Sequence, residues 1–100
     1  MTIEINVVND VVTAILNGRL DTPAATKFAQ DMQPLMDQAD KHIVLDCAKM
    51  EFIASSGLRL FLALRKQTIA KGGDVTIKNL TPDVKTVFTI TGFLSLFNFE

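Results

Sequence analysis

The stretch EFIASSGLRLFLALRK, residues 51–66, decides how this chain folds. The polar residues Ser-Ser-Gly at 55–57 separate a short apolar segment from a long run of good helix formers, which stops at Gly-Gly, residues 72–73. This composition predicts a helix from Ser55 or Ser56 to about Lys71. A serine before such a run is a natural N-cap, and the glycine after it allows close approach of the backbone.

The same two serines also admit a functional interpretation. A hydroxyl at a helix N-terminus lies at the positive end of the helix dipole, beside unpaired N–H groups that are natural partners of an anion. Phosphorylation would add roughly −1.5 to −2 charges at one surface point. Such a change can break an interface without unfolding the domain, as a switch requires.

The helix that follows the serines carries two groups of apolar side chains. The group expected to face the sheet is Leu58, Phe61, Leu62 and Ile69. Leu60 and Leu64 fall on nearly the opposite side, where two leucines at i, i+4 would form a small apolar patch beside the serine turn. Alternatively, the tail FLSLFNFE, residues 93–100, folds over this patch. In either case the serine turn and this flank can form one docking surface.

The chain before this stretch predicts a hairpin, a helix and a strand. TIEINVV and VVTAIL alternate in polarity around the turn residues Asn-Asp at 9–10, which indicates two antiparallel strands. Residues 20–40 predict a helix with Asp21 or Thr22 as N-cap and a kink or break near Pro34. HIVLD reads as a short buried strand, with EFI as a second apolar contact.

After Gly-Gly, DVTIK alternates as another half-exposed strand. A last helix should begin with Thr81 as N-cap and Pro82 in its first turn, and should stop at Gly92. The tail is expected to be a short helix or a terminal strand. The order β-β-α-β-α-β-α predicts one α/β domain over residues 1–100: a small mixed sheet with helices mainly on one face.

The sequence offers little for enzyme or metal chemistry. His42 and Cys47 are each the only residue of their type, and neither has the partners that a catalytic or metal site needs. No Walker-type or dinucleotide-type glycine pattern is present. The Ser-Ser-Gly-Leu turn falls short of a nucleophile elbow, which needs glycine on both sides of the serine at fixed spacing, and position 54 is Ala. We therefore expect no catalytic activity, no metal and no cofactor.

Charge and hydropathy restrict the other classes of function. Ten Lys and Arg nearly balance eleven Asp and Glu, without a basic run and without Trp or Tyr, so we expect no nucleic-acid partner. No apolar run approaches the roughly 18 residues of a membrane span, so we expect no direct membrane insertion. The opening MTIEINVVND has no secretory pattern, which makes the cytoplasm the expected location.

Several motifs in register resemble one family. The run from HIVLD through SSGL, Gly-Gly and DVTIK to Gly-Phe at 92–93 is similar to the STAS domain of bacterial anti-sigma factor antagonists. NGRLD, residues 17–21, resembles the Gly-x-Leu-Asp that follows the second strand of the family. The resemblance covers essentially the whole chain and implies a single STAS-like domain.

The resemblance also implies a partner-switching role in signalling and transcription regulation. In the family, the unphosphorylated domain binds an anti-sigma factor that is also a serine kinase. That kinase phosphorylates the first serine of the turn, here Ser55, which ends the interaction, and a PP2C-type phosphatase restores it. The implied partner-binding surface comprises Asp21, Ser56, Gly57, Leu60 and Leu64.

One position departs from the family pattern. Typical members carry Asp immediately before the first serine, where this chain has Ala54. The alternative function is therefore a phosphorylation-independent STAS adaptor subunit of a membrane transport or lipid-trafficking complex. Such an adaptor would bind constitutively through Leu60, Leu64 and the tail.

Overall fold

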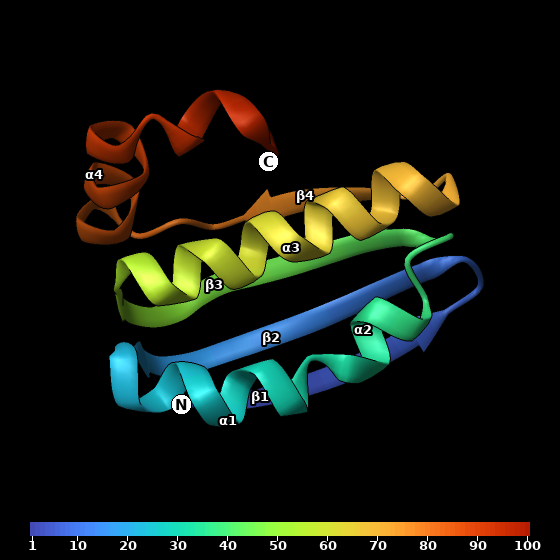
Figure 1. The fold of residues 1–100 in the computed structure, drawn as a ribbon, viewed down its shortest axis with the longest axis horizontal. Coiled ribbons are helices and arrows are strands. Elements are labelled where there is room, and N and C mark those ends of the chain that lie inside the picture. Colours follow the sequence, from blue (N-terminus) through green and yellow to red (C-terminus); the bar gives the residue numbers. More distant parts are fainter.

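The computed structural model describes all residues 1–100 and contains one five-stranded sheet in the order β1-β2-β3-β4-β5. The elements in chain order are β1 (Thr2–Val8), β2 (Val11–Leu20), α1 (Thr22–Asp31), α2 (Gln33–Asp37), β3 (His42–Ile53), α3 (Ser55–Lys71), β4 (Asp74–Lys78), α4 (Pro82–Thr91), the 3-10 helix η1 (Phe93–Leu96) and β5 (Asn98–Phe99). Helices α1, α2 and α3 lie along one face of the sheet, α4 lies beyond the end of β4 and contacts β3, and the C-terminal segment returns to pair with β4 (Figure 1). The predicted mixed α/β architecture is confirmed.

Strand pairing follows the predicted pattern, with one antiparallel pair at the N-terminus. β1 pairs antiparallel with β2, and the three remaining pairs are parallel. The hairpin turns at Asn9, whose positive φ of 56° is a conformation that asparagine tolerates. β2 runs past the predicted end at Leu16, because register shifts around Asn17 and Gly18 let it stay paired with β3. Gly18 adopts φ 110°, so the break in the apolar pattern is an irregularity within a strand rather than its end.

β3 is one continuous strand of 12 residues, so the division into HIVLD and a separate EFI contact was wrong. The intervening residues stay in the sheet because Lys49 and Met50 pair with Asn17 and Gly18 across the shifted register. Met50 is fully buried, which fixes this part of the strand against the core. β3 therefore carries the chain directly to the serine turn.

The predicted ends of the helices are largely confirmed. Pro34 falls in the first turn of α2, and the chain breaks between α1 and α2 as expected. Gly72 and Gly92 end α3 and α4 with left-handed φ values of 88° and 77°. Thr81 is the N-cap residue of α4, although its hydroxyl donates to the Met50 carbonyl, at 3.4 Å, rather than capping the helix.

The core joins the inner face of the sheet to the helices through a phenylalanine cluster. The ring of Phe61 in α3 lies 6.1 to 6.5 Å, between centroids, from those of Phe28, Phe88 and Phe97. Phe97, in the tail, is 8% exposed, so the tail packs into the molecule. It does so both as a 3-10 helix and as strand β5, which combines the two forms that the sequence left open.

The face that α3 presents to the core differs from the prediction. Its buried residues are Gly57, Leu58, Phe61, Leu64 and Thr68. Leu64 is 1% exposed and Ile69 is 62% exposed, so the expected patch at Leu60 and Leu64 was wrong, as was the inward placement of Ile69. The helical wheel failed because Gly57 and Thr68, which carry no apolar signal, lie at the centre of the buried stripe.

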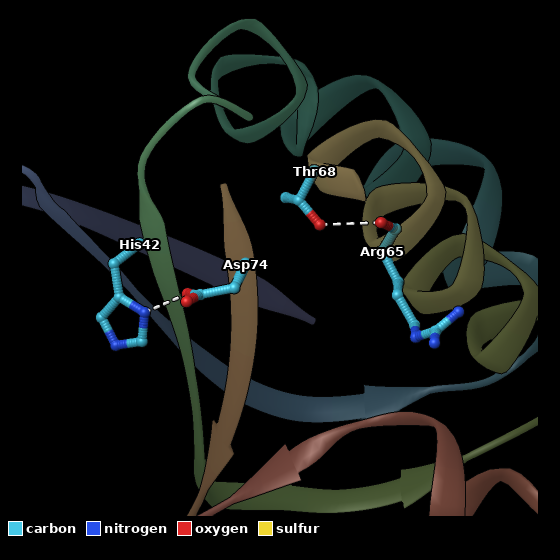
Figure 2. Close-up of polar contacts among 4 residues, drawn as sticks. All are labelled: His42, Arg65, Thr68 and Asp74. Carbon is cyan, nitrogen blue, oxygen red and sulfur yellow. Dashed lines mark hydrogen bonds and ion pairs between the residues drawn. The ribbon is translucent and has the colours of Figure 1, made fainter. Parts of the chain in front are cut away.

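Thr68 can be buried because its hydroxyl is satisfied locally. Its Oγ1 donates to the Arg65 carbonyl, one turn earlier in α3, at 2.7 Å (Figure 2). Such a bond to the helix's own backbone removes the penalty of burying an unpaired hydroxyl. Thr68 can therefore occupy the buried side of α3, while Ile69, the next residue, faces outward.

Candidate functional site

The serine turn lies where two parallel strands end and two helices begin. β2 ends at Leu20 and β3 at Ile53, which are paired, and the Ala54 N–H donates to the Leu20 carbonyl at 2.9 Å. α1 and α3 start immediately after these strands, so their N-termini meet at one edge of the sheet (Figure 1). The Ser56 hydroxyl lies 3.5 Å from that of Thr22, within the limit of a weak hydrogen bond. This edge, beyond the carboxyl ends of the strands, is a common location for binding sites in α/β proteins.

The two helix starts are capped differently. Asp21 is the N-cap of α1, and its Oδ1 accepts from the Ala24 N–H at 3.0 Å, as predicted. Ala54 is the N-cap of α3 in a similar extended conformation, but it has no side-chain acceptor. The expectation that a serine caps α3 was therefore wrong by one position, because Ser55 already has its place inside the first turn.

The absence of a capping side chain leaves donors free at the start of α3. The Ala54 carbonyl accepts from the N–H groups of Gly57 and Leu58, at 3.0 and 3.1 Å. The N–H groups of Ser55 and Ser56 have no protein acceptor. Two backbone donors and the positive end of the helix dipole therefore surround the serine side chains.

The two serines differ in accessibility. Ser55 is exposed and its hydroxyl makes no hydrogen bond within the protein, whereas Ser56 is half-buried beside Thr22. Gly57 is buried, and a Cβ at that position would lie 2.7 and 2.8 Å from side-chain atoms of Leu20. Gly57 thus lets α3 pack closely on the end of β2 and offers no side chain to a partner.

Only some of the residues predicted to bind a partner are accessible at the surface of the structure. Asp21 is half-buried beside this edge, Leu60 is half-buried against the core, and Leu64 is enclosed within it. The four residues with some exposure are Ser55, Ser56, Asp21 and Leu60. Leu64 and Gly57 are inside because the buried stripe of α3 runs through both of them.

Two arginines near this edge were missed by the sequence reasoning. Arg59 is exposed, forms no ion pair, and lies four residues after Ser55 on the same side of α3. Arg19 stacks on Phe52, with its guanidinium carbon 4.5 Å from the ring centre, at the paired ends of β2 and β3. The i, i+4 spacing from Ser55 could have identified Arg59, whereas the Arg19 contact depends on the shifted register of the strands.

The other candidate reactive residues lie away from the serine turn. His42 Nδ1 and the Asp74 carboxylate form a hydrogen bond at the opposite ends of β3 and β4, where these strands start (Figure 2). Cys47 is fully buried, and burial, with a smaller contribution from Asp46, raises the pKa of its thiol to about 12. A thiol with this pKa is an unreactive core side chain. No cluster of three or more His, Cys, Asp or Glu side chains suited to a metal ion is present.

None of the helices combines the length and apolar character that crossing a bilayer demands.

Comparison with known proteins agrees with this fold. The STAS domain family model matches residues 2–100. A relative from Bordetella bronchiseptica, named as the anti-sigma factor antagonist BtrV, is 30% identical over 97 residues, covering 97% of this chain and 84% of the relative.

Solved structures give the same result for the fold. The crystal structure of an anti-sigma factor antagonist from Mycobacterium paratuberculosis matches with a TM-score of 0.85 at 19% identity, covering 98% of this chain and 83% of the other. The Bacillus cell fate determinant SpoIIAA in its phosphorylated form matches with a TM-score of 0.72 at 22% identity, over 99% of this chain and 91% of the other. The family-model match and the Bordetella relative, together with this fold, show that the chain belongs to the STAS domain family, among the anti-sigma factor antagonists.

Proposed function

We propose that the chain is an anti-sigma factor antagonist whose unphosphorylated form binds an anti-sigma factor with serine kinase activity. In this proposal the kinase transfers a phosphoryl group to the Ser55 hydroxyl, the complex dissociates, and a PP2C-type phosphatase resets the cycle. The observation that carries the proposal is the exposed, unbonded Ser55 hydroxyl at the uncapped start of α3, in a family with a structurally described phosphorylated member. Sigma factors act in the cytoplasm, which is where this role would place the chain.

The start of α3 supports a phosphate on Ser55 without disruption of the fold. Ser55 is exposed, so a phosphate would stay in solvent rather than displace core atoms. The free N–H groups of Ser55 and Ser56 and the helix dipole favour an anion at this position. The modification should therefore leave the folded domain intact and act on the surface alone.

Arg59 supplies a second reason why a phosphate would change the surface. It is exposed, has no acidic partner, and follows Ser55 by one helical turn. Arginine pairs with phosphate through two parallel N–H donors, which makes such contacts stronger than neutral hydrogen bonds. A phosphate on Ser55 would thus add negative charge and draw Arg59 away from any acidic group of the bound partner.

The proposal assigns no chemistry to the chain itself. Its residues present an acceptor hydroxyl, while the kinase supplies ATP and the catalytic groups. No histidine, carboxylate or lysine makes a hydrogen bond to Ser55 that would activate it as a nucleophile. Binding and release of a protein partner is the activity that this surface supports.

The adaptor alternative has less support, because it relied on an exposed surface at Leu60 and Leu64. The side chains of Leu64 and of Phe97 in the tail are buried, so neither side chain is available for constitutive docking. Ala54 remains the observation in its favour, since it removes the acidic residue that typical members carry beside the first serine.

A binding experiment with matched serine variants tests the proposal. Each anti-sigma factor kinase of the host would be titrated by calorimetry with wild type, Ser55→Ala, Ser55→Asp and Ser56→Ala. We expect one kinase to bind wild type and Ser55→Ala with similar affinity, and to bind Ser56→Ala, which introduces no charge, more tightly than Ser55→Asp. Ser55→Asp should bind that kinase at least on the order of tenfold more weakly, which corresponds to about 1.4 kcal/mol.

Two controls separate a switch from a general defect. The midpoint of thermal unfolding should be nearly the same for wild type and Ser55→Asp, because position 55 is exposed. Incubation with the bound kinase and ATP should phosphorylate wild type and Ser56→Ala but leave Ser55→Ala unmodified. Equal affinity of wild type and Ser55→Asp for the kinase would refute the proposed switch.

A further inference from the structure

We propose that a second copy of this chain binds along the free edge of β1, in antiparallel register, and joins the two sheets into one. β1 is the outermost strand, seven residues long, and pairs on one side only. The opposite edge of the sheet is β5, which has only two residues. An edge of this length presents a row of unpaired backbone groups to any chain that matches it.

The hairpin determines which backbone groups of β1 are free. Only Asn9 and Asp10 lie between the paired residues Val8 and Val11, so this pair is the hydrogen-bonded pair that closes a two-residue turn. In an antiparallel ladder, residues alternate between pointing their N–H and C=O at the neighbouring strand and pointing them away. Counting back from Val8, the residues with outward backbone groups are Ile3, Ile5 and Val7.

The edge lacks the features with which proteins protect such strands. β1 contains no proline and no lysine, its only charged residue is Glu4, and its pairing with β2 has no register shift. Apolar side chains are also exposed at its turn end: Val7 is 49% and Val8 is 67% exposed. Pairing with another strand would satisfy the backbone groups and cover part of this apolar surface.

The amino-acid pattern of β1 is complementary to itself. Ile5 is the midpoint of Thr2–Val8, so a twofold axis through Ile5 pairs all seven residues of one copy with the seven of the other. Ile3 then lies opposite Val7 of the second copy, and Glu4 lies opposite Asn6, so no like charges meet. A register centred on Glu4 would instead place two carboxylates directly opposite each other, which is unfavourable. In this register the apolar face of β1, formed by Ile3, Ile5 and Val7, continues into the same face of the second copy, which favours a second copy as the occupant.

A groove beside β1 provides room for the inward side chains of that strand. The groove has a volume of about 450 Å³ and is lined by Thr2, Ile3, Ile5, Lys27 and Asp31. Its charged residues already pair with each other, with 2.7 Å between Lys27 Nζ and an Asp31 carboxylate oxygen. The isoleucine side chains of a second β1 would therefore lie against Ile3 and Ile5, beside a charged pair that needs no new partner.

The proposed dimer is independent of the serine switch. Ser55 follows β3, and β2 lies between β3 and β1, so the new interface is on the far side of β2 from the serine turn. Each dimer would therefore present two serine turns. Failure of the dimer would leave the proposed role of Ser55 unaffected, and the reverse is also true.

Charge substitutions at Asn6 give a test with two opposite outcomes. Asn6→Glu would place a second carboxylate opposite Glu4 of the other copy, twice per dimer, whereas Asn6→Lys would create two ion pairs. By sedimentation equilibrium, we expect Asn6→Glu to raise the dimer dissociation constant by on the order of tenfold and Asn6→Lys to lower it similarly. The matched controls are Asn98→Glu and Asn98→Lys, on the exposed opposite edge, which should leave the constant unchanged.

Amide hydrogen exchange tests the register directly. On raising the concentration through the dimerisation range, the N–H groups of Ile3, Ile5 and Val7 should become protected. Those of Glu4 and Asn6, which already bond to β2, should change little. A monomer mass at all concentrations up to about 1 mM would overturn the proposal, as would equal shifts for Asn6→Glu and Asn6→Lys. Exchange of Ile3, Ile5 and Val7 that does not depend on concentration would overturn it too.

Discussion

Replacing Ala54 by aspartate should stabilise the folded chain, because α3 begins without a capping side chain. Ala54 has the extended backbone of an N-cap, with φ −93° and ψ 168°. Asp21 has nearly the same conformation, with φ −85° and ψ 179°, and caps α1 through its carboxylate. The chain thus contains a capped and an uncapped helix start of matching geometry.

The expected size of the effect follows from this internal comparison. An aspartate at position 54 can accept from the N–H of Ser56 or Gly57, in the way that Asp21 accepts from the Ala24 N–H at 3.0 Å. A good N-cap contributes about 1 kcal/mol relative to alanine. Ala54→Asp should therefore raise the free energy of unfolding by about 1 kcal/mol, and Asp21→Ala should lower it by about the same amount. In a domain of this size, about 1 kcal/mol shifts the unfolding midpoint by roughly 4 to 8 °C.

Urea and thermal unfolding, followed by circular dichroism, measure both variants under the same conditions. Ala54→Asn serves as a control, because it offers the capping oxygen without the charge and should retain most of the gain. A loss of stability on Asp21→Ala with no gain on Ala54→Asp would refute the reasoning. That result would mean that the donors at the start of α3 are satisfied in a way that the helix geometry does not indicate.

Four further substitutions test the packing and the buried thiol. Gly57→Ala should destabilise the domain by about 1 to 2 kcal/mol in urea unfolding, because its Cβ would press on the buried side chain of Leu20. Unchanged stability would contradict the close packing of α3 against Leu20. Gly72→Ala should destabilise the domain by about 1 to 2 kcal/mol, because alanine is strained at a φ of 88° although its Cβ would have free space. Gly73→Ala should destabilise the domain more than Gly72→Ala does, because its Cβ would collide with backbone carbonyl groups. Burial raises the pKa of Cys47 from 9.0 to about 12, so between these values the unfolded chain loses a proton that the folded chain keeps. As the pH rises through this range, the free energy of unfolding of wild type should therefore fall more steeply than that of Cys47→Ala, by about 1.4 kcal/mol per pH unit. Equal slopes for the two proteins would show that the thiol pKa is not raised by burial.

Much of the fold could be predicted from local signals in the sequence. Asp21 predicted the start of α1, Pro34 the break before α2, and Gly72 the end of α3, because capping and backbone constraints act over a few residues. The alternation in TIEINVV predicted the half-exposed first strand. These features depend little on the rest of the molecule.

The errors concern features that long-range packing determines. Leu64 was placed outside and Ile69 inside, because the rotation of α3 depends on Gly57 fitting against Leu20, a contact between distant parts of the chain. β3 was divided because its continuity depends on the shifted register with β2. Ser55 was singled out only through the family resemblance, and its neighbour Arg59 was overlooked.

Mass spectrometry of the protein purified from its native host shows whether Ser55 is the residue that carries phosphate. Intact mass and phosphopeptide analysis, in growing and in starved cells, would show whether the protein carries phosphate and at which residue. We expect a fraction of the molecules to carry one phosphate, located on Ser55. Protein that is unmodified under both conditions, or that carries phosphate on another residue with Ser55 free, would contradict the account.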